Sequence, residues 1–252
     1  MTALEAPRAY LEPVPLTRLA RAEWRKTTDT RAARWLLATT ALTTIAALAV
    51  PLAFPHGVTQ SRASYLLWAG LGLSRLLPIT LMLAMTAEWS QRTALTTFTL
   101  TPRRGRVLAA KLVTGLCLST VAGLAAFGAA ELTVTLARSL GRPVSASLSG
   151  PQLAGFAAFV LLTSAIGMAI GTALHNTAAA IVTYFGLAAA FSLLMIPAVA
   201  RIGDWVNTGQ TFGWVLAGQW AGHAAQIATS TALWVALPLA FGLIRTLRRE
   251  VR

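Results

Sequence analysis

The sequence predicts an all-α integral membrane protein with six transmembrane helices, because of its composition, its long apolar runs and the placement of its charges. Apolar residues account for 56% of the 252 residues and charged residues for only 12%. About a quarter of the residues of an ordinary soluble domain are charged. A chain so poor in charge is therefore expected to lie in a membrane.

Six apolar segments are long enough to cross a bilayer, which requires about 20 helical residues with a rise of about 1.5 Å each. The first segment follows a long polar-rich stretch instead of the short basic start of a signal peptide, so we interpret it as a retained span. Gly167 and Gly171, within the fourth segment, would permit a close helix contact. The predicted spans lie near residues 35–54, 65–87, 107–137, 152–174, 177–200 and 227–244.

The positions of the basic residues indicate the orientation, because Lys and Arg stay on the cytoplasmic side of short loops. Sixteen of the 21 Lys and Arg residues fall in the N-terminal segment, the second loop and the C-terminal tail, and four fall on the opposite side. We therefore expect both termini in the cytoplasm and the protein in the cell membrane. Contact with membrane lipids then accounts for the net charge of +13, and no nucleic acid partner is expected.

The segment before the first span divides into two parts. Residues 1–15 contain three prolines and are expected to be a disordered leader. In residues 16–34, apolar residues from Leu16 to Trp24 recur at helical spacing between basic residues. This pattern predicts an amphipathic interfacial helix with its basic face toward anionic headgroups, and a solvated helical leader is the alternative. Residues 35–252 would form the six-span domain.

Two charged residues, Arg75 and Glu131, fall within the second and third predicted spans. A charge at the centre of a bilayer costs about 2.5 to 3.5 kcal/mol, so a compensating contact is expected. Because the two spans run in opposite directions, the two groups would differ in depth by about one helical turn. We therefore consider a salt bridge or a shared aqueous cavity between them, the alternative being that each reaches water independently.

The sequence contains no recognisable enzyme site. It has one cysteine, Cys117, and three widely separated histidines without a second ligand at the spacing of a metal site. It has no paired carboxylates, no nucleophile beside a base, and no phosphate loop of the form G-x-x-x-x-G-K-[ST]. We therefore expect no catalysis, no metal and no cofactor in this chain.

The segment AEWSQRTALTTFTLTPRRGRVLAAK, between the second and third spans, gathers charge and threonines between two apolar runs. Thr101 and Pro102 have the form of an N-cap followed by proline at the first helical position, so a helix is expected to restart there. Helical spacing also links the residues Trp89, Thr93, Thr97 and Leu100. The pattern predicts a short helix at the cytoplasmic membrane face, and an inert connecting loop is the alternative.

At these residues the sequence resembles the ABC-2 type transporter permeases. Their first cytoplasmic loop has a glutamate at the end of the second span, then a threonine, a proline, arginines, and a lysine that enters the third span. The stretch TPRRGRVLAAK is similar to forms common among actinobacterial members, although Arg92 stands where the family often has glycine. The matching residues are Glu88, Thr93, Pro102, Arg104, Arg106 and Lys111.

The resemblance implies that this segment is a coupling helix that docks into a separate ABC ATPase subunit, where ATP and Mg would bind. It also implies a second permease, identical or related, and export driven by ATP hydrolysis on the partner. A non-transporting accessory or sensory membrane subunit is the alternative. The implied coupling residues are Glu88, Trp89, Arg92, Thr93, Thr97, Pro102, Arg104, Arg106 and Lys111.

Overall fold

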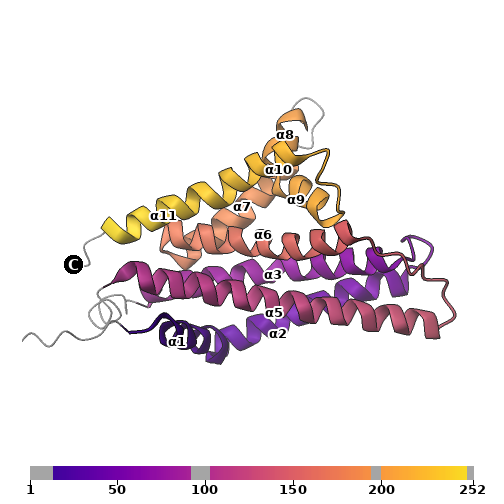
Figure 1. Cartoon of the computed structure of the whole chain (residues 1–252), viewed down its shortest axis with the longest axis horizontal. Coiled ribbons are helices and arrows are strands. Elements are labelled where there is room, and N and C mark those ends of the chain that lie inside the picture. Colours follow the sequence, from indigo (N-terminus) through magenta and orange to yellow (C-terminus); the bar gives the residue numbers. More distant parts are fainter. Residues whose placement is uncertain (1–13, 92–102, 194–199, 249–252) are drawn as a thin grey trace, which may run out of the picture.

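The computed structural model describes residues 14–91, 103–193 and 200–248. These residues fold into long helices that lie side by side, with shorter helices grouped at one corner (Figure 1). Outside the helices, the described ranges contain one isolated β-bridge, between Ser61 and Ser145. The predicted all-α fold class is therefore confirmed for the described part of the chain.

Five helical segments of the described chain are long and apolar enough to cross a membrane. The fifth, Ala224–Arg248, is built from α10 (Ala224–Thr231), a π-helical turn η1 (Ala232–Ala236) and α11 (Leu237–Arg248). All five overlap predicted spans. The other four are α2 (Arg31–Ala53), α3 (Arg62–Ser90), α5 (Arg104–Ser139) and α6 (Gly150–Leu174).

The remaining predicted span, 177–200, is described only in part. Its described part is helix α7 (Thr177–Leu193), whose 17 residues give a length of about 25 Å, against the roughly 30 Å of a bilayer core. Residues 194–199 lie outside the described ranges. The short helices α8 (Ala200–Val206) and α9 (Thr208–Leu216) follow. The structure therefore supports five helices of span length, and the sixth span stays a prediction.

Side-chain caps define where three of the long helices begin. The Ser149 side chain accepts a hydrogen bond from the Gln152 backbone, and the Gln152 side chain accepts one from the Ser149 backbone, which completes a capping box before α6. The side chain of Ser61 caps α3, and that of Thr30 caps α2.

Thr30 has an extended backbone and separates α2 from α1 (Leu16–Asp29), so residues 16–34 form two helices where we predicted one.

Helix α3 lies at the centre of the bundle, against α2, α5 and α6. Its contact with α6 depends on the two glycines of the fourth predicted span. A Cβ atom added at Gly167 would collide with the backbone of Pro78, and one added at Gly171 would lie 2.9 Å from the Met85 Cβ. The predicted close helix contact at this glycine pair is therefore confirmed, and it is made within the chain.

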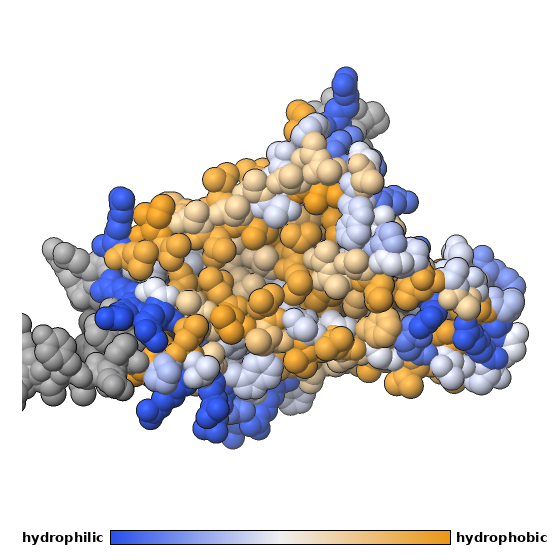
Figure 2. All heavy atoms as spheres, in the orientation of Figure 1, coloured by the Kyte–Doolittle hydropathy of each residue, from blue (hydrophilic) through white to orange (hydrophobic). Residues whose placement is uncertain are grey.

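The outer surface is apolar along the middle of the bundle and hydrophilic toward its two ends (Figure 2). Large apolar side chains face outward there, including Leu124 on α5 and Val182 on α7. Water would not favour so much exposed apolar surface, whereas lipid chains would. The arrangement is consistent with an integral membrane protein.

One end of the bundle, which we call the basic end, carries both described termini of the chain. Helix α1 lies there with the last turn of α3, the first turn of α5 and the last turn of α11 (Figure 1). The guanidinium of Arg106 on α5 donates a hydrogen bond to the carbonyl of Val14, just before α1, at 2.8 Å. The basic end therefore also carries both residues that flank the undescribed range 92–102.

Candidate functional site

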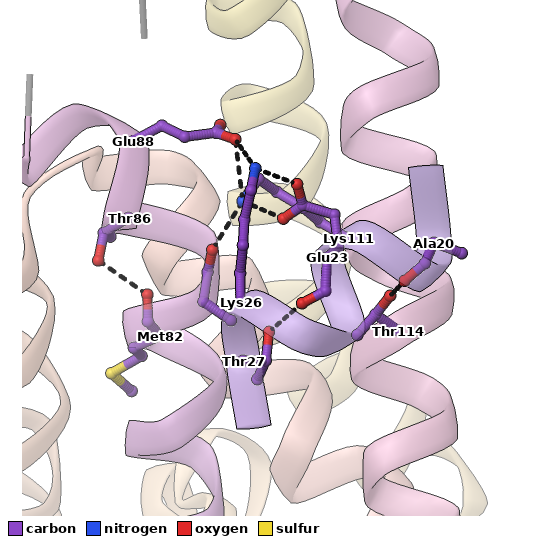
Figure 3. Close-up of polar contacts among 10 residues, drawn as sticks. Ala20, Glu23, Lys26, Thr27, Met82, Thr86, Glu88, Lys111 and Thr114 are labelled. Atoms are coloured by element: carbon purple, nitrogen blue, oxygen red, sulfur yellow. Dashed lines mark hydrogen bonds and ion pairs between the residues drawn. The ribbon is translucent and has the colours of Figure 1, made fainter. Parts of the chain in front are cut away.

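Four charged side chains from three helices form what we call the ion cluster at the basic end (Figure 3). The Lys111 Nζ atom of α5 lies 2.8 Å from Oε2 of Glu23 on α1 and 3.5 Å from Oε1 of Glu88 on α3. The Lys26 Nζ atom of α1 lies 2.6 Å from Oε1 of Glu23 and 3.3 Å from Oε1 of Glu88. Each ammonium group therefore bridges the same two carboxylates.

Three of the four side chains of the ion cluster are buried. The exposed fractions are 6% for Lys111, 8% for Glu23 and 5% for Glu88, whereas Lys26 is 51% exposed. Buried charges require partners and hydrogen bonds, because each would otherwise lose its hydration without compensation. Besides its two carboxylate partners, Lys111 donates a hydrogen bond to the backbone carbonyl of Ala84, at 2.9 Å. The cluster is thus a closed, charge-balanced set with Lys26 on its outer side.

The position of the ion cluster follows from helix ends and helix spacing. Glu88 lies in the last turn of α3, and Lys111 lies two turns into α5. Helix α1 crosses beside them and is held to α5 by a hydrogen bond from the Thr114 hydroxyl to the carbonyl of Ala20, at 3.1 Å. The two chain segments that flank residues 92–102 are therefore connected through α1 as well as to each other.

The lysines change the ionisation of Glu23. Burial on its own would raise the pKa of this carboxyl, but the charge and hydrogen bond of Lys111, followed by those of Lys26, hold the pKa below its ordinary value of 4.5. Burial on its own would lower the pKa of Lys26, but the hydrogen bond and charge of Glu23, followed by the charge of Glu88, raise it above its ordinary value of 10.5. Both shifts favour the charged forms.

These shifts predict how the docking of α1 depends on pH. A carboxylate with a lowered pKa stabilises the folded state above its unfolded pKa, and this contribution is lost as the pH falls through the folded value. A lysine with a raised pKa contributes below its unfolded pKa, and this contribution is lost as the pH rises through the folded value. Docking should therefore be strongest between the ordinary values of 4.5 for Glu23 and 10.5 for Lys26.

Spin labels can test the acid side of this range. We place nitroxides at the exposed positions Ala22 on α1 and Val113 on α5, with the native Cys117 replaced by alanine. The distance distribution should be narrow at neutral pH and should broaden at a pH well below 4.5, when Glu23 becomes protonated. A Glu23→Gln control should show a broad distribution already at neutral pH, because the pair between Lys111 and Glu23 is lost. An unchanged distribution throughout acid titration of the unmodified cluster would contradict the assignment.

A second set of contacts ties the end of α3 to α6 and α11. The rings of Trp89 and His175 stack with centroids 4.4 Å apart. His175 ends α6 with a left-handed backbone, φ 53°, and its Nε2 atom lies 2.9 Å from the Thr246 hydroxyl of α11. Arg245 adds a hydrogen bond to the carbonyl of Ala173, at 2.8 Å. Trp89, in the segment predicted to couple, is thus fixed to the opposite side of the bundle from α1.

The structure brings together the predicted coupling residues that it describes. Trp89, Arg104 and the Glu88–Lys111 pair line one small pocket at the basic end, and Arg106 binds the chain before α1. The other predicted coupling residues lie outside the described ranges; they are Arg92, Thr93, Thr97 and Pro102.

Sequence reasoning missed Glu23 and Lys26, because it assigned residues 16–34 to the membrane interface. The spacing of Ala20, Glu23 and Thr27 could have indicated a helical face that packs against protein, because these residues lie on one side of the helix. In the structure, this face meets α5 and buries Glu23 and Thr27. The side of α1 that docks is therefore partly polar, and it is matched by polar groups on α3 and α5.

The predicted pairing of Arg75 with Glu131 needs correction. Glu131 accepts hydrogen bonds from Nε of Arg62, at 2.9 and 3.0 Å. Arg62 begins α3, and Arg75 lies 13 residues further along it, a distance of about 20 Å at a rise of 1.5 Å per residue. Because α5 runs antiparallel and ends at Ser139, Glu131 lies at the depth of Arg62. Arg75 instead lines a cavity with Tyr184.

The fold places the chain among helical proteins whose features are consistent with an integral membrane protein. Comparison with family models, with curated proteins and with solved structures found no match. Within the described part of the chain, no three His, Cys, Asp or Glu side chains are grouped so that they could hold a metal ion. The function is therefore inferred from the chain's own residues.

Proposed function

We propose that the chain is the transmembrane subunit of an ATP-driven ABC transporter of the ABC-2 type, working as an exporter in the cell membrane with both termini in the cytoplasm. ATP and Mg would bind to a separate ATPase subunit. A second permease, identical or related, would complete the membrane part. The observation that carries this proposal is the ion cluster, which connects both flanks of residues 92–102 to one another and to α1.

The ion cluster would make the basic end move as one unit. An ATPase that pushes on residues 92–102 would displace Glu88 and Lys111, on either side of that segment. Separating Lys111 from Glu23, or Glu88 from Lys111 and Lys26, would leave a buried charge without its partner, at a cost of about 3–5 kcal/mol. Helix α1 would therefore move with α3 and α5, which suits a connector between two discrete states.

The distribution of charge supports the orientation in this proposal. In the described ranges, most Lys and Arg side chains lie on α1, at the start of α2 and α5, and at the end of α11. All of these segments lie at the basic end (Figure 1). Because basic residues stay on the cytoplasmic side, the basic end would face the cytoplasm and the ATPase.

A cysteine crosslink to the ATPase tests the proposed partner. In a Cys117→Ala background, a cysteine at Thr97 should form a crosslink to a co-expressed ATPase encoded beside this chain. A cysteine at Ser147, which is exposed beyond the other end of the bundle, is the matched control and should form none. If no ATPase co-purifies with the chain in mild detergent, or both positions crosslink equally, the proposal fails in favour of a non-transporting accessory or sensory subunit.

A further inference from the structure

A cavity of about 340 Å³ lies away from the ion cluster, between α3, α6, α7, α9 and η1. Arg75, which lines it, is 13 residues from the first residue of α3 and 15 from the last. The cavity is therefore near the middle of a helix that is long enough to cross a membrane. Its volume falls at the lower end of the range for small-molecule sites, about 300–1,000 Å³.

Arg75 supplies positive charge at this cavity. Glu23 and Glu88 are occupied in the ion cluster and Glu131 is paired with Arg62, and no carboxylate in the described ranges forms an ion pair with Arg75. A guanidinium at this depth is costly unless it faces water or an anion. The cavity beside Arg75 therefore has the charge to accept an anionic group.

The rest of the cavity wall is mainly apolar and aromatic. Phe159, Phe212 and Trp234 contribute rings, while Thr163 and Asn207 contribute a few polar groups. Trp234 belongs to the π-helical turn η1, and its Nε1 atom donates to the carbonyl of Val206 at 2.7 Å, which fixes the indole. π-Helical turns are frequent at functional sites. The cavity thus has a charged group beside an apolar, aromatic wall. An amphiphile has the same two parts, a charged headgroup and an apolar chain.

Two residues that line the cavity are exposed on the outside of the bundle. Arg75 is exposed, and Phe185, which also lines the cavity, is 51% exposed. Tyr184 lies beside them and donates a hydrogen bond to the carbonyl of Ser74, at 3.2 Å, which holds α7 against α3. An occupant would therefore enter sideways from the lipid, and not along a polar channel.

We propose that this cavity binds a single-chain amphiphile with an anionic headgroup, such as a fatty acid. The headgroup would pair with Arg75 and the acyl chain would lie along Phe159, Phe212 and Trp234. The small volume favours one acyl chain over a two-chain phospholipid. This binding site does not depend on the proposed transport function.

Equilibrium binding of radiolabelled palmitate to the purified full-length chain in a neutral detergent tests the site. Hexadecanol, which has the same chain length without the charge, should compete at least tenfold more weakly. Arg75→Gln should weaken palmitate binding about tenfold, because a hydrogen-bonded charge pair is lost. The matched control Arg201→Gln, on the exposed surface of α8, should leave binding unchanged.

A second variant tests the cavity independently of charge. Gly213 on α9 lines the cavity, and a Cβ atom added there meets nothing within 4 Å, so Gly213→Leu should fill the space without disturbing the helix. It should abolish palmitate binding, whereas Gly186→Leu, which also points into open space but lies outside the cavity lining, should not. Equal binding of palmitate and hexadecanol, or unchanged palmitate binding by Arg75→Gln or by correctly folded Gly213→Leu, would overturn the proposal.

Discussion

Replacement of Lys111 by methionine is expected to lower the free energy of unfolding by about 3–5 kcal/mol, because it leaves two buried carboxylates with one partially exposed partner. Lys111 is 6% exposed and bridges Glu23 and Glu88, which are also buried. Methionine keeps the length of the apolar stem, so the change removes mainly the charge and its hydrogen bonds. The melting temperature in detergent should fall by roughly 10 °C, a shift in proportion to that loss for a chain of this size.

The control for this measurement is Lys26→Met. Lys26 contacts the same two carboxylates, but it is 51% exposed, and exposed ion pairs contribute about 0–1 kcal/mol. Its melting temperature should therefore stay close to that of the unaltered chain. Adding Glu23→Gln and Glu88→Gln to Lys111→Met should recover much of the lost stability, because no uncompensated buried charge would remain. Equal losses for the two lysine variants would contradict the buried role of Lys111.

Replacement of Gly167 by leucine should have the second large effect, a loss of roughly 3 kcal/mol or more. A Cβ atom at this position collides with the backbone of Pro78 on α3, and a backbone cannot move aside as a flexible side chain can. Helices α3 and α6 would be forced apart along a contact that organises the centre of the bundle. The expected readout is a lower melting temperature and early loss of monodispersity in detergent.

Gly128→Leu provides the matched control for the Gly167 variant. Gly128 is also a glycine within a long apolar helix, α5, but a Cβ atom there has nothing within 4 Å. This variant should unfold at or slightly above the temperature of the unaltered chain, because glycine within a helix is unfavourable in itself. A similar loss for both variants would show that the effect comes from helix glycines in general and not from the α3–α6 contact.

The long helices were predictable because each apolar run is long enough to determine its own structure. The segment that became α6, for example, joins an uninterrupted apolar run to a start at Ser149 and an end at His175. The glycine pair Gly167 and Gly171 also indicated a close contact, although its partner helix could not be read from spacing. The predicted 177–200 span stays a prediction, since α7 covers Thr177–Leu193 and residues 194–199 lie outside the described ranges.

The ion cluster was only half predictable. The resemblance to the ABC-2 permease loop singled out Glu88 and Lys111, but Glu23 and Lys26 lie far from them in the sequence. An amphipathic helix can turn either face toward protein, and only the depth at which α1 crosses α5 brings Glu23 to Lys111. Likewise, Glu131 pairs with Arg62 and not with Arg75. Which arginine lies beside Glu131 depends on how far α3 and α5 are shifted along each other, and residue spacing within each helix does not determine that shift.

The most direct test of the proposed function is the nucleotide dependence of the crosslink between a cysteine at Thr97 and the ATPase subunit, measured in the Cys117→Ala background. We predict that the crosslinking yield differs between the nucleotide-free complex and the complex trapped with ATP and Mg by a hydrolysis-deficient ATPase, and that Lys111→Met reduces this difference. An ATPase that binds the chain but gives the same yield at Thr97 with and without nucleotide would contradict the proposed coupling role of residues 92–102.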